Sequence, residues 1–279
     1  MYQIDDVSAG SLRLDGGAMF GIVPKALWSR QAESDEQNRI ELGMRCLLLR
    51  GHGRTVLVDC GIGDRFDDKF AGIYGVVHPR DTFARALAAH GVAPAGVTDI
   101  LLTHLHFDHA GGCTRIDDDG RLVPAFANAT YHVQRRHWEW AHESPREGAS
   151  FLREHMEPLA EHDRLNLLEE GASPLPDIEL VVVNGHTRAM QLPLIHGGDT
   201  PLLYVADLAP TAAHVPLLWI MAYDIAPLDT LEEKRRILGR AAREGWTLAF
   251  EHDPRVARAR VEETGKGLVA VVEGSGMSD

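Results

Sequence analysis

The chain of 279 residues is long enough for one large α/β domain or two small ones, with a sizeable hydrophobic core. Its net charge of −13 disfavours nucleic acids and anionic membranes as partners. The first residues lack the basic and apolar segments of a signal peptide, and no apolar run has the length of a membrane span. Together with three irregularly spaced cysteines, these features predict a cytoplasmic protein with reduced thiols.

The N-terminal segment contains a loop with two large apolar side chains. A predicted strand over residues 11–14 leads into the loop 15–21, which carries Met19 and Phe20 on a glycine-rich backbone. The loop either packs as a turn at the edge of the fold or forms a lip whose side chains touch an apolar group of a ligand. The sequence is compatible with both interpretations.

A hairpin and a helix follow. Apolar residues over 45–49 and 55–58 flank a Gly-His-Gly turn, and the second strand ends at Asp59. Residues 82–90 have helical periodicity and end before a glycine. The partly β-branched segment 97–102 predicts another strand.

The strand over 97–102 runs directly into Thr-His-Leu-His-Phe-Asp-His-Ala-Gly-Gly, where four potential metal ligands fall within six residues. An extended backbone places the imidazoles of His104 and His106 on one face. Asp108 and His109 stand where the strand gives way to a helix or loop, so their side chains can point toward two neighbouring ions. The small residues that follow allow tight backbone packing behind the ligands. This string predicts a metal site.

The remaining segments alternate between strand and helix patterns. Residues 147–168 are charged and mostly helical in pattern, and residues 231–243 predict an amphipathic helix with Thr230 as N-cap and Glu233 three residues on. The other predicted elements are a helix over 134–142 and strands over 130–133, 176–183, 191–195, 201–205, 246–250 and 268–272. Three of these strands end just before His186, Asp207 and His252.

The His-x-His-x-Asp-His string and the three later residues resemble the metallo-β-lactamase superfamily of hydrolases, over roughly residues 15–254. The resemblance implies an α/β fold, a four-layer αββα sandwich, which we expect to form a single domain over residues 1–279. It also implies a dinuclear metal site. His104, His106 and His186 would hold the first metal, Asp108, His109 and His252 the second, and Asp207 would bridge both. Asp59 would accept a hydrogen bond that orients the metal-binding loop.

The implied ligand set predicts two divalent metal ions. Nitrogen and oxygen ligands without thiolate suit Zn²⁺, but Mn²⁺, Fe²⁺ and Co²⁺ are also compatible. A hydroxide shared by the two metals would attack the carbonyl of a lactone or other ester in a small-molecule substrate. Asp108 would carry the proton to the leaving group. Nothing in the sequence defines the oligomeric state, and a homodimer is one possibility.

Several features indicate which branch of the superfamily the chain resembles. Antibiotic-cleaving β-lactamases usually carry Cys where Asp207 stands, and the 27 residues after His252 are too few for the C-terminal domain of glyoxalase II-like enzymes. The chain looks most like N-acyl-homoserine lactonases and organophosphate hydrolases. The alternatives are a phosphotriesterase or arylesterase, an iron-dependent oxygenase resembling persulfide dioxygenases, and a non-catalytic binding protein.

The sequence departs from this branch at two places. Arg188 and Ala189 stand where members often have Pro-Gly, which can alter the turn that positions His186. Pro210 stands where well-studied lactonases use a Tyr to polarise the carbonyl. Tyr223 is a candidate substitute from another loop, with a role as a core aromatic as the alternative.

Overall fold

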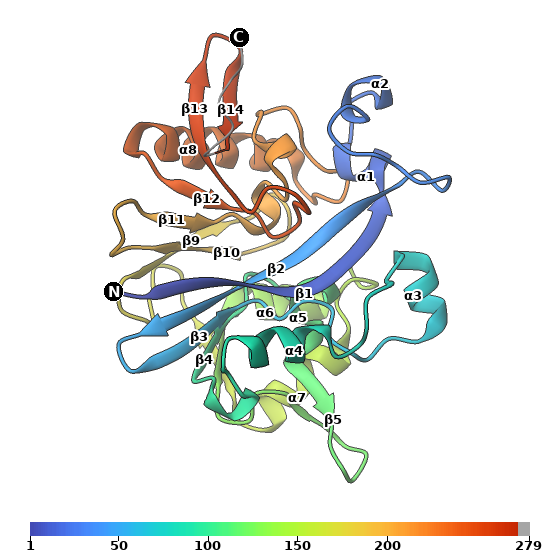
Figure 1. Ribbon diagram of the computed structural model, residues 1–279, viewed down its shortest axis with the longest axis vertical. Coiled ribbons are helices and arrows are strands. Elements are labelled where there is room, and N and C mark those ends of the chain that lie inside the picture. The colour runs from blue at the N-terminus through green and yellow to red at the C-terminus, as the bar shows by residue number, and fades with distance from the viewer. Residues whose placement is uncertain (273–279) are drawn as a thin grey trace.

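The computed structural model describes residues 1–272 and has four layers, in which two β-sheets pack face to face between helices (Figure 1). In order across the first sheet, the strands are β1 (Gln3–Asp15), β2 (Arg39–Gly51), β3 (Arg54–Val58), β4 (Asp99–Leu101), β7 (Thr130–Gln134) and β8 (Leu165–Leu168). Across the second sheet they are β14 (Gly267–Val271), β13 (Arg258–Thr264), β12 (Thr247–Ala249), β11 (Leu202–Tyr204), β10 (Met190–Ile195) and β9 (Ile178–Val183). This arrangement confirms the predicted αββα sandwich.

The two-residue period of the strands explains the layers. In β2, Leu47 and Leu49 pack with the second sheet, whereas Leu48 packs with the helices on the other side. In β3, Val58 packs with the second sheet, whereas Leu57 packs with the helices. At β2 and β3, both faces of the first sheet are therefore buried, as their near-continuous apolar runs predict.

Helices cover the outer faces of the two sheets (Figure 1). The long helix α8 (Pro227–Glu244) packs on the second sheet through Ile237, Leu238 and Ala241. On the first sheet, α4 (Thr82–Ala89), α6 (Arg135–Glu143) and α7 (Arg153–Glu161) contribute to one apolar cluster. The remaining short elements are α1 (Gly16–Phe20), α2 (Lys25–Trp28), α3 (Asp68–Tyr74), α5 (Phe107–Ala110), the 3₁₀ turns η1 (Pro94–Gly96), η2 (Gly111–Cys113), η3 (Ala206–Leu208) and η4 (Ala212–His214), and the hairpin of β5 (Thr114–Ile116) and β6 (Leu122–Pro124).

Three local predictions are wrong. The segment 15–21 contains the helix α1, because the Asp15 carboxylate accepts a hydrogen bond from the Ala18 amide and caps it. Within 147–168, only α7 is helical, and β8 joins the sheet by pairing with β7. Helix α8 begins at Pro227, so Thr230 lies inside it, where its hydroxyl donates to Asp224 instead of capping the helix.

Strands of both sheets end at one common edge of the sandwich, and the potential ligands follow these strand ends. Strands β3, β4, β7 and β8 run parallel in the first sheet, and β11 and β12 run parallel in the second. The segments that follow β3, β4, β9, β11 and β12 carry Asp59, the His104–His109 string, His186, Asp207 and His252. Carboxyl ends of parallel strands meet at one edge, which is where α/β folds place ligands.

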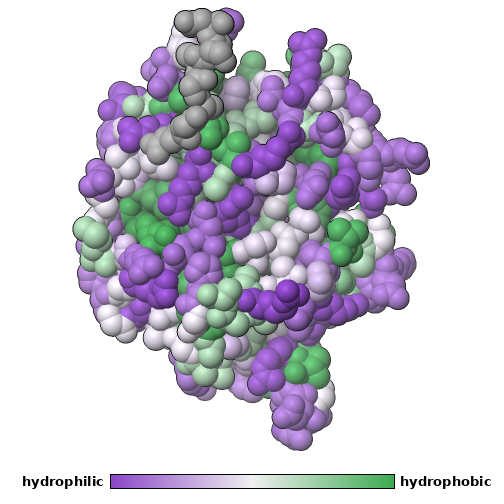
Figure 2. Space-filling model, in the orientation of Figure 1, coloured by the Kyte–Doolittle hydropathy of each residue, from purple (hydrophilic) through white to green (hydrophobic). Residues whose placement is uncertain are grey.

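The face drawn in Figure 2 is mostly hydrophilic, with hydrophobic side chains in separate patches. Among residues 1–272, the longest helix, α8, is too polar to lie across a bilayer, and no other helix approaches the required length and apolarity.

Candidate metal centre

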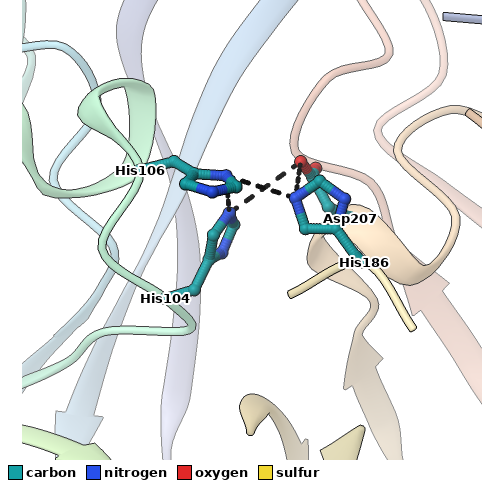
Figure 3. Close-up of side chains that lie close together, drawn as sticks. All are labelled: His104, His106, His186 and Asp207. Atoms are coloured by element: carbon teal, nitrogen blue, oxygen red, sulfur yellow. Dashed lines mark hydrogen bonds and ion pairs between the residues drawn. The ribbon is translucent and has the colours of Figure 1, made fainter. Parts of the chain in front are cut away.

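Four side chains converge in a first group of potential ligands. Figure 3 shows His104 and His106 pointing toward His186 and Asp207 from the opposite sheet. His104 Nε2 lies 3.0 Å from His106 Nδ1, which lies 3.2 Å from His186 Nε2. The Asp207 carboxylate lies 3.1 Å from His186 Nε2. All four residues are buried.

Asp108, His109 and His252 form a second group, and Asp207 lies between the two. The Nε2 atoms of His109 and His252 are 3.2 Å apart, and the Asp108 carboxylate lies 4.0 and 3.8 Å from them. Asp207 Oδ1 lies 3.2 Å from His252 Nε2, while Oδ2 faces His186 in the first group. The structure therefore brings all seven predicted side chains together, with one carboxylate shared.

Each imidazole in the two groups has an acceptor for its second nitrogen. His106 Nε2 donates to Glu147, His186 Nδ1 to Asp224 and His252 Nδ1 to the Gly43 carbonyl, at 3.0, 3.0 and 2.7 Å. The two remaining imidazoles complete the set: His104 Nδ1 donates to the Thr103 hydroxyl, and His109 Nδ1 faces the carboxylates of Asp59 and Glu251. Such partners fix the tautomer, so that the other nitrogen of every ring can offer a lone pair to the centre.

Asp59 organises the loop that carries the first four potential ligands. Its carboxylate accepts hydrogen bonds from the amide and hydroxyl of Thr103, both at 2.7 Å, and lies 3.0 Å from His109 Nδ1. The loop packs closely behind it, since a Cβ on Gly112 would lie 2.3 Å from the Cys60 carbonyl. Asp59 itself has a φ of 57°, in the left-handed region. A strained backbone held at such a point is common at functional sites.

The charges of the centre depend on one another. Burial, reinforced by the neighbouring histidines, holds the pKa of His104 well below its ordinary value. Burial also opposes the charged form of His252, but the Asp207 carboxylate raises the pKa of that imidazole to about 9. For Asp207, burial works against ionisation, yet His186, His252 and His109 hold its pKa well below the usual range. Metal binding here must displace protons, since only the unprotonated nitrogens can act as ligands.

The donor set fits divalent metal ions. Within each group, neighbouring imidazole nitrogens lie 3.0–3.2 Å apart. Because the N–H of each ring points outward, the lone pairs of these nitrogens face one another, and a cation between them would remove the repulsion. Asp207 Oδ1 is buried and makes no hydrogen bond within the described part of the chain. A cation at each group would satisfy these atoms. The carboxylates of Asp59 and Glu251 form a third group with His109, but they face its outward nitrogen, Nδ1.

A cavity of about 390 Å³ opens onto the centre, within the size range of small-molecule sites. Five of the seven potential ligands line it, together with the apolar residues Leu14, Met19, Leu42 and Met221. Tyr223 also lines the cavity and is 38% exposed. Phe20 does not line it, because its ring stacks between Trp28 and His214 in the core. Of the two side chains on the predicted lip, only Met19 reaches this space.

Both places where the sequence departs from the family pattern make hydrogen bonds near the centre. After His186, the Ala189 amide donates to the Asn184 side chain, and the Arg188 carbonyl accepts a hydrogen bond from His137. The other nitrogen of His137 accepts from the Leu105 amide at 2.9 Å, so this buried ring ties the turn to the histidine string. The Pro210 carbonyl accepts from the His252 amide. The turn at Arg188 and Ala189 thus retains a hydrogen-bonded position beside the centre.

Sequence reasoning missed Glu147, Asp224 and Glu251 as partners of the histidines. Glu147 opens the charged segment 147–168 and lies 41 residues from His106, so no local pattern connects the two. Asp224 lies 38 residues from His186. Glu251 does have a local signal, since it immediately precedes His252 at the end of a strand.

The fold and the ligand geometry define an αββα protein with a potential two-metal centre between its sheets. Residues 43–252 match the model of the metallo-β-lactamase superfamily, and the chain belongs to this family. A relative among characterised proteins is an N-acyl homoserine lactonase from Bacillus sp., 29% identical over 182 residues, which are 62% of this chain and 66% of the relative. The chain thus spans slightly less than two thirds of that relative's length.

Two solved structures are similar over nearly the whole chain. A probable metal-dependent hydrolase from Staphylococcus aureus is 28% identical, with a TM-score of 0.88 and 98% of both chains covered. AidC, a dizinc quorum-quenching lactonase solved with the product N-hexanoyl-L-homoserine, has a TM-score of 0.78 at 17% identity, covering 98% of this chain and 94% of its own. The likeness to AidC shows the shared fold.

Proposed function

We propose that this protein is a dinuclear metal-dependent hydrolase that opens a lactone or cleaves another small carboxylic ester. One observation carries the proposal: the Asp207 carboxylate lies 3.1–3.2 Å from an imidazole nitrogen of each ligand group. Two ions bound to the groups would therefore share this carboxylate, at the floor of a cavity large enough for a small molecule. The N-acyl homoserine lactonases among the relatives support a lactone as substrate.

In this proposal His104, His106 and His186 would hold one ion, Asp108, His109 and His252 would hold the other, and Asp207 would be available to both. Two divalent ions, of which Zn²⁺ best suits these donors, would supply a hydroxide at neutral pH and stabilise an oxyanion. Glu147, Asp224 and Asp59 keep the imidazoles in the required tautomer and orientation.

Two side chains of the cavity are suited to proton chemistry. Asp108 lines the cavity on the side of the second group, where its carboxylate can carry a proton to the departing alkoxide. Burial, with smaller contributions from nearby acidic groups, raises the pKa of Tyr223 to about 12. Its hydroxyl therefore stays protonated at neutral pH and can donate a hydrogen bond to the substrate carbonyl.

Substrate turnover by metal-loaded protein tests the proposal. The protein would be reconstituted with Zn²⁺, Mn²⁺, Fe²⁺ or Co²⁺ and assayed against lactones, thioesters and phosphotriesters. We expect ring opening of acyl-homoserine lactones, with longer acyl tails lowering KM because Leu14, Met19, Leu42 and Met221 offer apolar surface. Inert lactones together with rapid turnover of glutathione thioesters would contradict the assignment.

A further inference from the structure

The cavity contains one permanently charged cation that the proposed hydrolysis does not use. Arg146 lines the cavity and donates through Nη2 to the Ala222 carbonyl at 2.9 Å. This bond anchors the guanidinium beside Met221 and Tyr223, which line the same space. An arginine side chain offers five N–H donors, and this contact uses one nitrogen, so several donors remain for a ligand.

No carboxylate of the cavity neutralises Arg146. Asp108 and Asp207 face the histidines of the two ligand groups. Glu147, the next residue in the chain, accepts from His106, from the Trp140 indole and from the Ser144 hydroxyl. Within residues 1–272, Arg146 forms no ion pair, although the chain has 41 acidic and 28 basic residues. Its charge is therefore available to a molecule bound in the cavity.

We infer that Arg146 is a specificity-determining residue that selects lactones or esters bearing a carboxylate on the part of the molecule away from the reacting carbonyl. The inference rests on the proposed hydrolase function. A planar guanidinium pairs with a carboxylate through two parallel hydrogen bonds, which a neutral carbonyl cannot match. The apolar lining would contact the hydrocarbon segment between the two ends of such a substrate.

The net charge of −13 repels anions, but salt largely screens this repulsion beyond about 8–10 Å. Arg146 is exposed, and a carboxylate that binds to its guanidinium would lie well within this screening distance. A purely structural role is the competing explanation, because the bond to Ala222 could simply hold the loop that carries Tyr223. The two roles differ in one measurable respect. Loss of a structural residue lowers the turnover of all substrates alike, whereas loss of an anion-binding residue changes the preference between charged and neutral substrates.

A matched pair of esters separates these roles. The substrates are 4-nitrophenyl hexanoate, which is neutral, and the mono-4-nitrophenyl ester of adipic acid, which has the same acyl length and a terminal carboxylate. The metal-reconstituted native protein would be compared with Arg146→Met and Arg146→Lys. Arg121→Met serves as the control, since it removes the same charge from an exposed arginine outside the cavity, which pairs with Asp119 in the turn between β5 and β6.

We expect the ratio of kcat/KM for the anionic ester over the neutral ester to fall roughly three- to tenfold in Arg146→Met, as for a partly exposed ion pair with good geometry. Arg146→Lys should retain part of the preference, Arg121→Met should retain all of it, and added salt should lower the ratio only where residue 146 is charged. An unchanged ratio in Arg146→Met would overturn the inference while leaving the hydrolase function intact. If the native protein cleaves neither ester and opens no lactone, the proposed function fails, and the inference fails with it.

Discussion

Asp224 provides a test of how the centre holds His186. Its Oδ1 atom accepts from His186 Nδ1 at 3.0 Å, and its Oδ2 atom accepts from the Thr230 hydroxyl of α8. The side chain is 1% exposed, so water cannot replace either bond. Asp224→Asn keeps the shape but removes the negative charge that favours His186 with its proton on Nδ1 and its lone pair on Nε2.

The expected loss follows from the charge of this bond. A hydrogen bond to a charged group contributes about 1.5–3 kcal/mol. At about 1.4 kcal/mol per factor of ten, this corresponds to roughly a 10–100-fold weaker affinity for metal, the usual effect of removing such a partner. The effect should fall mainly on the ion of the first group, because His109 and His252 have their own acceptors.

Competition with a chromophoric chelator, on metal-free protein titrated with Zn²⁺, measures both affinities. Asp229→Asn is the matched control, since Asp229 is an exposed acid in the first turn of the same helix. For Asp224→Asn, we expect a weakened affinity for one equivalent of Zn²⁺ and a nearly unchanged affinity for the other. For the control, both affinities should be unchanged. If folded Asp224→Asn binds both equivalents with native affinity, the Asp224–His186 bond does not support the centre.

Other predictions address metal content, catalysis and stability. Metal analysis of gently purified protein should approach two equivalents, and a constant value near one after reconstitution would favour a mononuclear site. Asp108→Asn at saturating metal should lower kcat for lactones by roughly 10²–10⁴-fold. The loss of kcat should be smaller for nitrophenyl esters, whose leaving group needs little protonation. Near-normal lactone turnover would contradict a proton-carrying role for Asp108. Tyr223→Phe should cost no more than roughly tenfold in kcat/KM if it assists through one hydrogen bond. Burial opposes ionisation of Asp99, but hydrogen bonds from His132, Thr98 and Arg54 lower its pKa from 3.8 to about 2. Its stabilisation is thus complete above the unfolded pKa and is lost as pH falls through the folded one. In urea unfolding of metal-free protein, the stability difference between native protein and Asp99→Asn should shrink by about 2 kcal/mol between roughly pH 5 and pH 2, and a constant difference would refute the linkage.

The strands and the residues that end them could be predicted from local sequence. An apolar run that stops at a histidine or aspartate places that side chain at a sheet edge, and the structure has His186, Asp207 and His252 at such ends. The period of two also predicts the buried faces of β2 and β3.

The supporting contacts depend on tertiary packing and leave no such pattern. Glu147 meets His106 only because the segment after α6 folds back over the histidine string. Thr230 looks like a helix cap in isolation, but the Pro227 start of α8 places it where it supports Asp224. The orientation of Phe20 away from the cavity follows from α1, whose two opening glycines hide its helical character in the sequence.

The division of the seven potential ligands between two sheets also sets an order of events during synthesis. His104, His106, Asp108 and His109 emerge early, but neither group of ligands contains its full set of side chains until the second sheet is being made. Asp207 is the last residue of the first group to be synthesised, and His252 is the last residue of the second. A nascent chain with only the first sheet would therefore expose a partial histidine site, and tight metal binding would follow only after the two sheets have packed together.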